Sequence, residues 1–183
     1  WDGNWYENGD IFNFTQPYPD FDIERVTEYA NENGITLIGH HETGAGVLNY
    51  ESQLEDAFQL YNRLGVRAVK TGYVGQGQCI RSGMEDGEPQ LEWHHGQFMV
   101  RHYRKVVETA AKYGVMVNTH EPIKATGIRR TYPNMMTREG ARGQEYNAWS
   151  PDGGNPPDHT TILPFTRMLG GPFDHTPGIF DLT

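Results

Sequence analysis

The sequence has a single cysteine, Cys79, among its 183 residues. One thiol cannot form a disulfide within the chain, and Cys79 lacks the paired spacing of the cysteines in zinc and dithiol motifs. The sequence therefore excludes a disulfide scaffold and a multi-cysteine metal site, and it leaves the redox compartment open.

Positive charge and long apolar runs are also scarce. The chain has 15 Lys and Arg against 24 Asp and Glu, a formal net charge of -9, and its basic residues form no dense block. Because nucleic acids are bound through a positive surface, we expect no nucleic-acid partner. Apolar runs such as residues 35–38 are far shorter than the about 20 residues of a transmembrane helix, so we expect no membrane span.

The chain lacks an initiator methionine and a leader segment. It opens at Trp1 with a mixture of aromatic and acidic residues, which is typical of an internal start. We therefore expect a piece of a longer parent protein. A chain of 183 residues nevertheless suffices for one domain with its own core.

A helical pattern, a glycine and a short β-branched run follow one another three times. Asp22 is placed to cap the first expected helix. The apolar faces of the three helices comprise Ile23, Val26 and Tyr29/Ala30; Leu54, Ala57, Phe58, Tyr61 and Leu64; and Met99, Tyr103, Val106, Val107 and Ala110. The glycines that end them are Gly34, Gly65 and Gly114, and the expected strands are residues 35–38, 66–69 and 115–118.

Alternating helices and strands predict right-handed crossovers and a parallel sheet. No GxGxxG turn follows any expected strand, which argues against a dinucleotide-binding sheet. Polar clusters follow instead, at residues 39–42, 70–73 and 119–122. In a (β/α) barrel such strand ends line the active-site face, so the sequence predicts an α/β fold that is part of a (β/α)8 TIM-type barrel.

We count about five of the roughly eight strands that such a barrel needs, which indicates that residues 1–183 form an incomplete catalytic barrel domain. The less regular second half carries loop signals at residues 131–134 and 151–157 and a short helical pattern over residues 162–169. An incomplete barrel exposes two sheet edges, so self-association through these edges is expected.

Three glutamates, Glu42, Glu121 and Glu145, stand at or just past expected strand ends. Glycoside hydrolysis needs a proton donor to the leaving oxygen and a second carboxylate that attacks the sugar or activates water. A single surface glutamate is usually just solvated. The repeated His-Glu pair, at Glu42 and again at Glu121, favours a catalytic role.

The same strand ends allow two kinds of metal site. His40, His41 and His120 offer the nitrogen donors of a zinc site. Glu121, Glu139 and Glu145 offer only oxygen donors, which favour calcium. The spacing does not decide between them.

Basic and aromatic residues occur in the same region. Lys70 at a strand end is placed either to bind sugar hydroxyls or to extend its charge from the sheet edge into water. Tyr73, Trp93, Tyr146 and Trp149 are candidate platforms for sugar rings, although aromatic residues more often pack in cores. His94, His95 and His102 are interpreted as solvated polar residues at and on a helix.

From about Gly39 onward the sequence resembles glycoside hydrolase family 97, a bacterial α-glucosidase and α-galactosidase family. The segments that carry the resemblance are residues 39–43, 69–74, 120–122, 130–134, 138–146 and 159–167. They are long strings in the family's order, so chance is a poor explanation.

The resemblance implies a periplasmic or secreted enzyme that acts on oligosaccharides. Its catalytic barrel would be flanked by a β-sandwich and a smaller C-terminal β domain, neither of which residues 1–183 contain. By motif position, the general acid is Glu145 and the pair that activates water is Glu42 with Glu121. Calcium would be bound by Glu121, Glu139 and Glu145, and the sugar would be contacted by His40, Lys70 and His120.

One position separates the branches of the family. Retaining members carry a nucleophilic Asp two residues after the strand Lys, and this chain has Gly72 there. On this ground we predict an inverting, calcium-assisted α-glucosidase. The alternatives are a retaining α-galactosidase-like enzyme, an inactive fragment that only binds sugar or calcium, and a histidine-metal hydrolase. Residues 78–90 are longer than the resemblance predicts and are expected to reshape the substrate entrance.

Overall fold

The computed structural model of the chain describes residues 12–74 and 80–175. Its centre is a parallel four-stranded sheet of β1 (Ile38–Glu42), β2 (Ala68–Gly72), β5 (Met116–Thr119) and β6 (Met135–Arg138), in that order. All neighbouring pairs are parallel, so their carboxyl ends share one edge of the sheet. This arrangement confirms the prediction of a partial α/β barrel.

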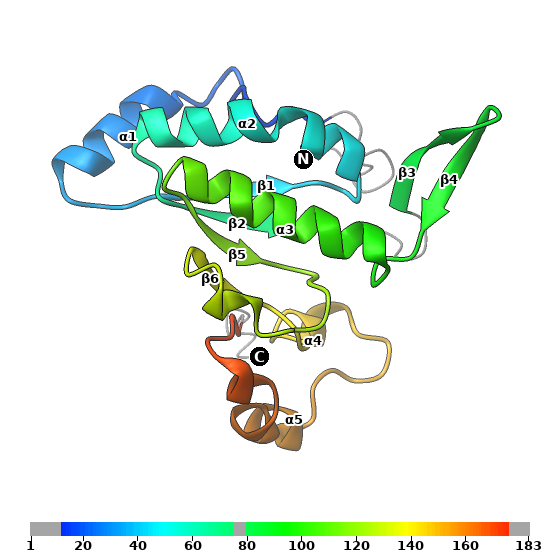
Figure 1. The fold of residues 1–183 in the computed structure, drawn as a ribbon. Helices are drawn as coiled ribbons and strands as arrows, with labels where there is room; N and C mark the ends of the chain where they lie inside the picture. The colour runs from blue at the N-terminus through cyan, green and yellow to red at the C-terminus, as the bar shows by residue number, and fades with distance from the viewer. Residues whose placement is uncertain (1–11, 75–79, 176–183) are drawn as a thin grey trace.

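Three helices flank the sheet on one side (Figure 1): α1 (Ile23–Glu32), α2 (Val47–Leu64) and α3 (Gln97–Lys112). The Asp22 side chain accepts a hydrogen bond from the Arg25 N–H at 3.1 Å and caps α1, as its position predicts. Gly65 ends α2 in the left-handed conformation, with a φ of 75°. A Cβ there would also lie 2.6 Å from the Asn31 side chain, so this close approach requires glycine.

The main core lies between the helices and the sheet. Val69 and Val117 project from the strands onto the predicted faces of α2 and α3, where Phe58 and Val106 are almost fully buried. The predicted face of α1 is wrong in part. Val26 is 38% and Tyr29 65% exposed, whereas Ala30 is buried as predicted and Thr27 is buried in addition.

The strands begin later than the apolar pattern predicts. The strand expected at residues 35–38 is β1 at Ile38–Glu42, and the other two are shifted by one or two residues. Backbone pairing continues past the apolar run into the polar cluster, because a parallel ladder depends on main-chain groups rather than on side-chain polarity. The polar clusters therefore belong to the carboxyl-terminal halves of β1 and β2 rather than to loops after them.

The long segment near residue 80 is not a loop. It forms an antiparallel hairpin of β3 (Ile80–Glu85) and β4 (Glu88–Glu92) that projects from the body of the molecule (Figure 1). Residues 78 and 79 of the expected loop, including Cys79, lie outside the described residues.

The last part of the chain has short elements only: a 3-10 turn at Ile128–Arg130, α4 (Tyr146–Trp149), α5 (Pro157–Ile162), and 3-10 turns at Leu163–Phe165 and Arg167–Gly170. The helical pattern expected over residues 162–169 is thus split, with Pro164 in the first turn of its own 3-10 helix. In the described part of the chain, no helix has both the length and the apolar character needed to cross a membrane.

Candidate active site

One face of the sheet carries a polar layer. His40 on β1 is in register with Lys70 on β2, which pairs with Asn118 on β5, which pairs with Thr137 on β6. Because side chains alternate along a strand, this layer faces away from the valines that pack on the helices. Glu42 and Gly72 form the next pair on the same face, nearer the carboxyl-terminal edge.

His40, Lys70 and His120 are brought together on this face. Burial, together with the charges of Lys70 and His120, lowers the pKa of His40 to about 4. His40 is therefore neutral at physiological pH, with 38% of its side chain exposed. A neutral imidazole beside an ammonium group offers both kinds of hydrogen bond to a sugar hydroxyl.

The carboxylate of Glu42 is fixed by main-chain donors. Its Oε1 accepts from the N–H of Gly44 at 2.8 Å and from the N–H of Val74 at 3.1 Å. Its Oε2 points into the space beside Gly72, where an added Cβ would lie 2.0 Å away. Burial raises the pKa of Glu42, as does the charge of Glu121, although the two backbone hydrogen bonds oppose this.

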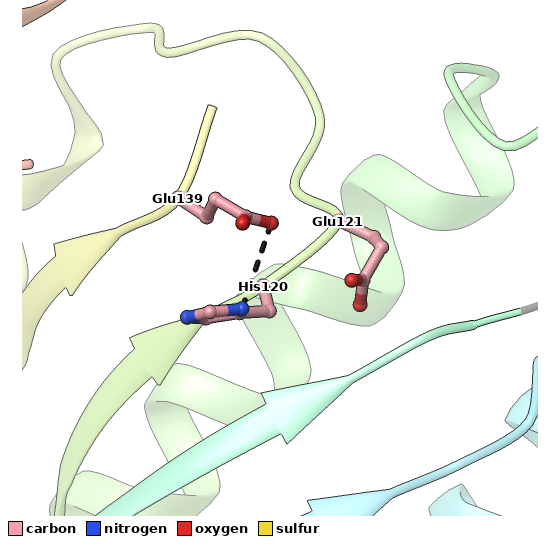
Figure 2. Close-up of side chains that lie close together, drawn as sticks. All are labelled: His120, Glu121 and Glu139. Atoms are coloured by element: carbon pink, nitrogen blue, oxygen red, sulfur yellow. Dashed lines mark ion pairs between the residues drawn. The ribbon is translucent and has the colours of Figure 1, made fainter. Parts of the chain in front are cut away.

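A second acidic group gathers at the ends of β5 and β6. Ligand atoms of His120, Glu121 and Glu139 all lie within 4.8 Å of one another. Figure 2 shows Glu139 facing the His120 ring, with Nδ1 and Oε2 3.5 Å apart. Burial raises the pKa of Glu139; His120 lowers it, and the charges of Glu121 and Glu145 raise it again. This part of the site is therefore short of positive charge.

Glu145 lies at the rim of this group. It is exposed and stands directly before α4. Its charge reaches Glu139, but it contributes no atom to the close cluster, where His120 stands beside Glu121 and Glu139. The structure thus brings Glu121 and Glu139 together and leaves Glu145 further out.

Asp174 joins the site from the far end of the described chain. Its Oδ2 accepts from His120 Nε2 at 2.6 Å and from Asn118 Nδ2 at 2.7 Å, and its N–H donates to the Arg138 carbonyl. Burial raises the pKa of Asp174, but these side-chain hydrogen bonds outweigh it and leave the pKa low. Sequence reasoning missed this residue, because no motif marks it and it lies 54 residues from His120.

The three histidines proposed for zinc do not converge. His41 points to the helix side of β1, where its Nδ1 lies 2.9 Å from the Tyr50 hydroxyl and the rings of Phe14, Phe58 and Tyr61 surround it. Burial lowers the pKa of His41 to about 3. His40 and His120 are on the opposite face, so a site made of all three is wrong.

Two histidines interpreted as solvated are buried. Only 8% of His94 and 1% of His102 are exposed. His102 Nδ1 lies 2.8 Å from Glu51 Oε1, and its Nε2 lies 2.8 Å from the Tyr73 hydroxyl. The reading of both as solvated polar residues is wrong, because His102 lies on the buried face of α3 and His94, in the turn before α3, packs against the Glu121 carbonyl.

The candidate sugar platforms differ in position. Tyr73 is buried in the core against Met99 and Tyr103, so it is not available for stacking. Trp93 is 58% exposed, and the Tyr146 ring packs under the Arg142 guanidinium at 4.5 Å. The Trp149 side chain lies outside the described set.

The family model described as glycoside hydrolase 97 matches residues 1–141. A family 97 enzyme from Pseudoalteromonas sp. strain K8, in structures with panose and with acarbose, is 58% identical with a TM-score of 0.91; these matches cover all of this chain and 27% of that one.

Two curated relatives correct our prediction of the reaction. A probable retaining alpha-galactosidase of Streptomyces bingchenggensis is 28% identical over 98% of this chain, and a retaining alpha-galactosidase of Bacteroides thetaiotaomicron is 25% identical over 89%. The chain spans 24% and 21% of their respective lengths. Their names contradict the predicted inverting α-glucosidase.

The physical reason for the error lies at Gly72. We took its missing side chain to mean that no carboxylate stands beneath the sugar. The Glu42 carboxylate fills that very space, so a glycine at position 72 does not make the site free of acidic groups. The family model matches residues 1–141, and the chain shares its fold with a solved member that is 58% identical. The chain therefore belongs to glycoside hydrolase family 97.

Proposed function

We propose that this chain supplies the strand-end part of an active site that hydrolyses a terminal α-glycosidic bond of an oligosaccharide. The observation that carries the proposal is the convergence of Glu42 and Glu121 with His40, Lys70 and His120 at one edge of the sheet. Glycoside hydrolysis requires a pair of carboxyl groups at the scissile bond, and neutral and cationic groups beside them can bind the sugar hydroxyls.

An α-galactoside is the first candidate substrate, because both curated relatives are named for that sugar. A second candidate is favoured by a separate observation. The solved enzyme that is 58% identical was captured with panose, so panose-like oligosaccharides belong in the same test.

The reaction proposed is retention of configuration. One carboxylate attacks the anomeric carbon, and another protonates the leaving oxygen and then activates water. We assign the attack to Glu42, because Gly44 and Val74 hold its Oε1 and leave Oε2 directed toward the space beside Gly72. Glu145 on the exposed rim is assigned the acid and base role, where a leaving group has room.

We further propose that calcium binds beside this pair. Glu121 and Glu139 supply oxygen donors within one cluster, which suits calcium better than zinc, with Glu145 as a further ligand from the rim. When bound, the ion would supply a fixed positive charge that offsets the mutual repulsion of these carboxylates. His120 Nε2 donates to Asp174, and Nδ1, which faces Glu139, is left as a hydrogen-bonding group rather than a calcium ligand.

The test uses the longest natural protein that contains this sequence. Hydrolysis of p-nitrophenyl α-galactoside and of panose is measured for the wild type, Glu42→Gln and Glu145→Gln, with the exposed Glu24→Gln as a matched control. We expect both active-site variants to lose more than about 100-fold in kcat and the control to be unaffected. Full activity in Glu42→Gln would overturn the assignment, and a β-anomer as first product by NMR would overturn retention.

A further inference from the structure

Glu121 has an unusual backbone. Its φ is 42°, in the left-handed region that residues with a Cβ rarely adopt. Such a conformation persists only where surrounding contacts hold it, and it occurs preferentially at functional sites. The contacts that hold Glu121 therefore bear on where its carboxylate points.

Two buried side chains bind the Glu121 carbonyl oxygen. The Tyr103 hydroxyl, on α3, donates to it at 2.7 Å, and His94 Nε2, in the turn before α3, lies 2.5 Å from it. Because a carbonyl only accepts, His94 must carry a proton on Nε2. Both acceptor positions of this oxygen are thus occupied, and Tyr103 and His94 are only 6% and 8% exposed.

The other end of the residue is held as well. Glu121 Oε2 accepts a hydrogen bond of 2.7 Å from the Tyr73 N–H, at the end of β2. A turn of the peptide to the common right-handed region would move the carbonyl away from its two donors. The same turn would swing the carboxylate away from β2 and from the His120 and Glu139 cluster of Figure 2.

We infer that His94 and Tyr103 are positioning residues, which hold the Glu121 main chain in its left-handed conformation and so aim its carboxylate into the site. The inference rests on the proposed function of that site and adds two residues from outside it. Neither side chain lies on the polar face of the sheet; both act through the Glu121 carbonyl.

The test compares variants that remove one donor at a time. Tyr103→Phe deletes only a hydroxyl, His94→Ala deletes the imidazole, and His94→Gln keeps a donor in a side chain of similar reach. We expect Tyr103→Phe and His94→Ala each to lower kcat by about 3- to 10-fold, and His94→Gln to recover most of the loss. The double variant should lose more than either single variant, but not the product, because the two donors share one acceptor and contact each other. KM should change little.

The matched control is Tyr113→Phe, which deletes a hydroxyl that lies at the end of the same helix and donates to Glu55, away from the site. Melting temperatures identify variants that do not fold. If His94→Ala does not fold, the milder variants Tyr103→Phe and His94→Gln test the positioning role. If Tyr103→Phe and His94→Ala each keep the wild-type kcat while Glu121→Gln is inactive, the positioning role of His94 and Tyr103 is overturned. The proposed function of the site would then still stand. Full activity in Glu121→Gln would instead remove the proposed role of Glu121 itself.

Discussion

The carboxylate of Glu42 occupies the volume that a side chain on Gly72 would fill, since a Cβ on Gly72 would lie 2.0 Å from Glu42 Oε2. The two residues face each other across paired strands β1 and β2. The Glu42 side chain can therefore adopt its observed orientation only because residue 72 is a glycine. The pair links a single residue type in the sequence to the orientation of a proposed catalytic group.

Gly72→Ala should therefore lower activity more than stability. The added methyl meets the far end of a flexible side chain, so Glu42 can move aside, but it loses its bonds to the Gly44 and Val74 N–H groups. We expect kcat to fall by about 10- to 100-fold with a small change in melting temperature. Gly83→Ala in the β3–β4 hairpin is the control, because its Cβ would meet nothing closer than 4.0 Å. Equal activity in both variants would contradict the prediction.

His41 should make the fold sensitive to mild acid. Its pKa falls from 6.5 to about 3 on folding because the ring is buried, so below pH 6.5 the unfolded chain binds a proton that the folded chain does not. Stability is thus lost as pH falls from 6.5 to 3, by at most about 1.4 kcal/mol per pH unit from this residue. His41→Phe should flatten the slope of unfolding free energy against pH in this window.

That test is decided by how the free energy of unfolding changes with pH, not by its absolute value. His41→Phe leaves the buried Tyr50 hydroxyl without its partner, which lowers stability at every pH alike. Denaturant titrations at several pH values separate the two effects. An unchanged slope in the variant would show that His41 is not the group that titrates.

Glu51 contributes acid sensitivity in a lower window. Hydrogen bonds from buried His102 and from Lys105 hold the pKa of Glu51 at about 2, below its ordinary 4.5, although burial opposes this. The contribution of Glu51 to the free energy of unfolding is complete above pH 4.5 and disappears as pH falls to about 2. Glu51→Gln should therefore be less stable than wild type at pH 7, and the free energies of unfolding of the two proteins should converge as pH falls toward about 2. A constant difference would contradict the ion pair.

Asp174→Asn should weaken substrate binding through His120. The wild-type carboxylate accepts the His120 Nε2 proton, whereas an amide can turn its NH₂ group toward that nitrogen and favour the other tautomer. We expect kcat/KM to fall by roughly 10-fold or more, with the exposed Asp158→Asn unaffected. Full activity in Asp174→Asn would place this contact outside the working site.

Removal of calcium should reduce activity, and its return should restore it. Dialysis against a chelator followed by calcium or zinc distinguishes the two metals, and only calcium is expected to restore turnover. Glu139→Gln should raise the calcium concentration needed for half-maximal activity, because it removes one charged oxygen ligand from the cluster. A chelated enzyme with undiminished activity would refute the calcium proposal.

The sequence by itself determined the layout of the fold. Apolar spacing in α2 and α3 is a local property, and each of these helices buries the face that its spacing predicts. Helix and strand in alternation lead to a parallel sheet, whose carboxyl ends must share an edge. The approach of the polar strand ends that carry His40, Lys70 and His120 follows from this rule.

Only the tertiary structure decided which groups meet across that edge. The side chain of His41 points opposite to that of His40 because β1 extends through both, which the apolar pattern did not reveal. The bonds from Asp174 to His120 and from His94 to Glu121 join segments far apart in the chain, and they depend on how loops pack over the sheet. Short-range periodicity encodes which face of an element is apolar, but the partner of a buried polar group is fixed by the packing of the whole domain.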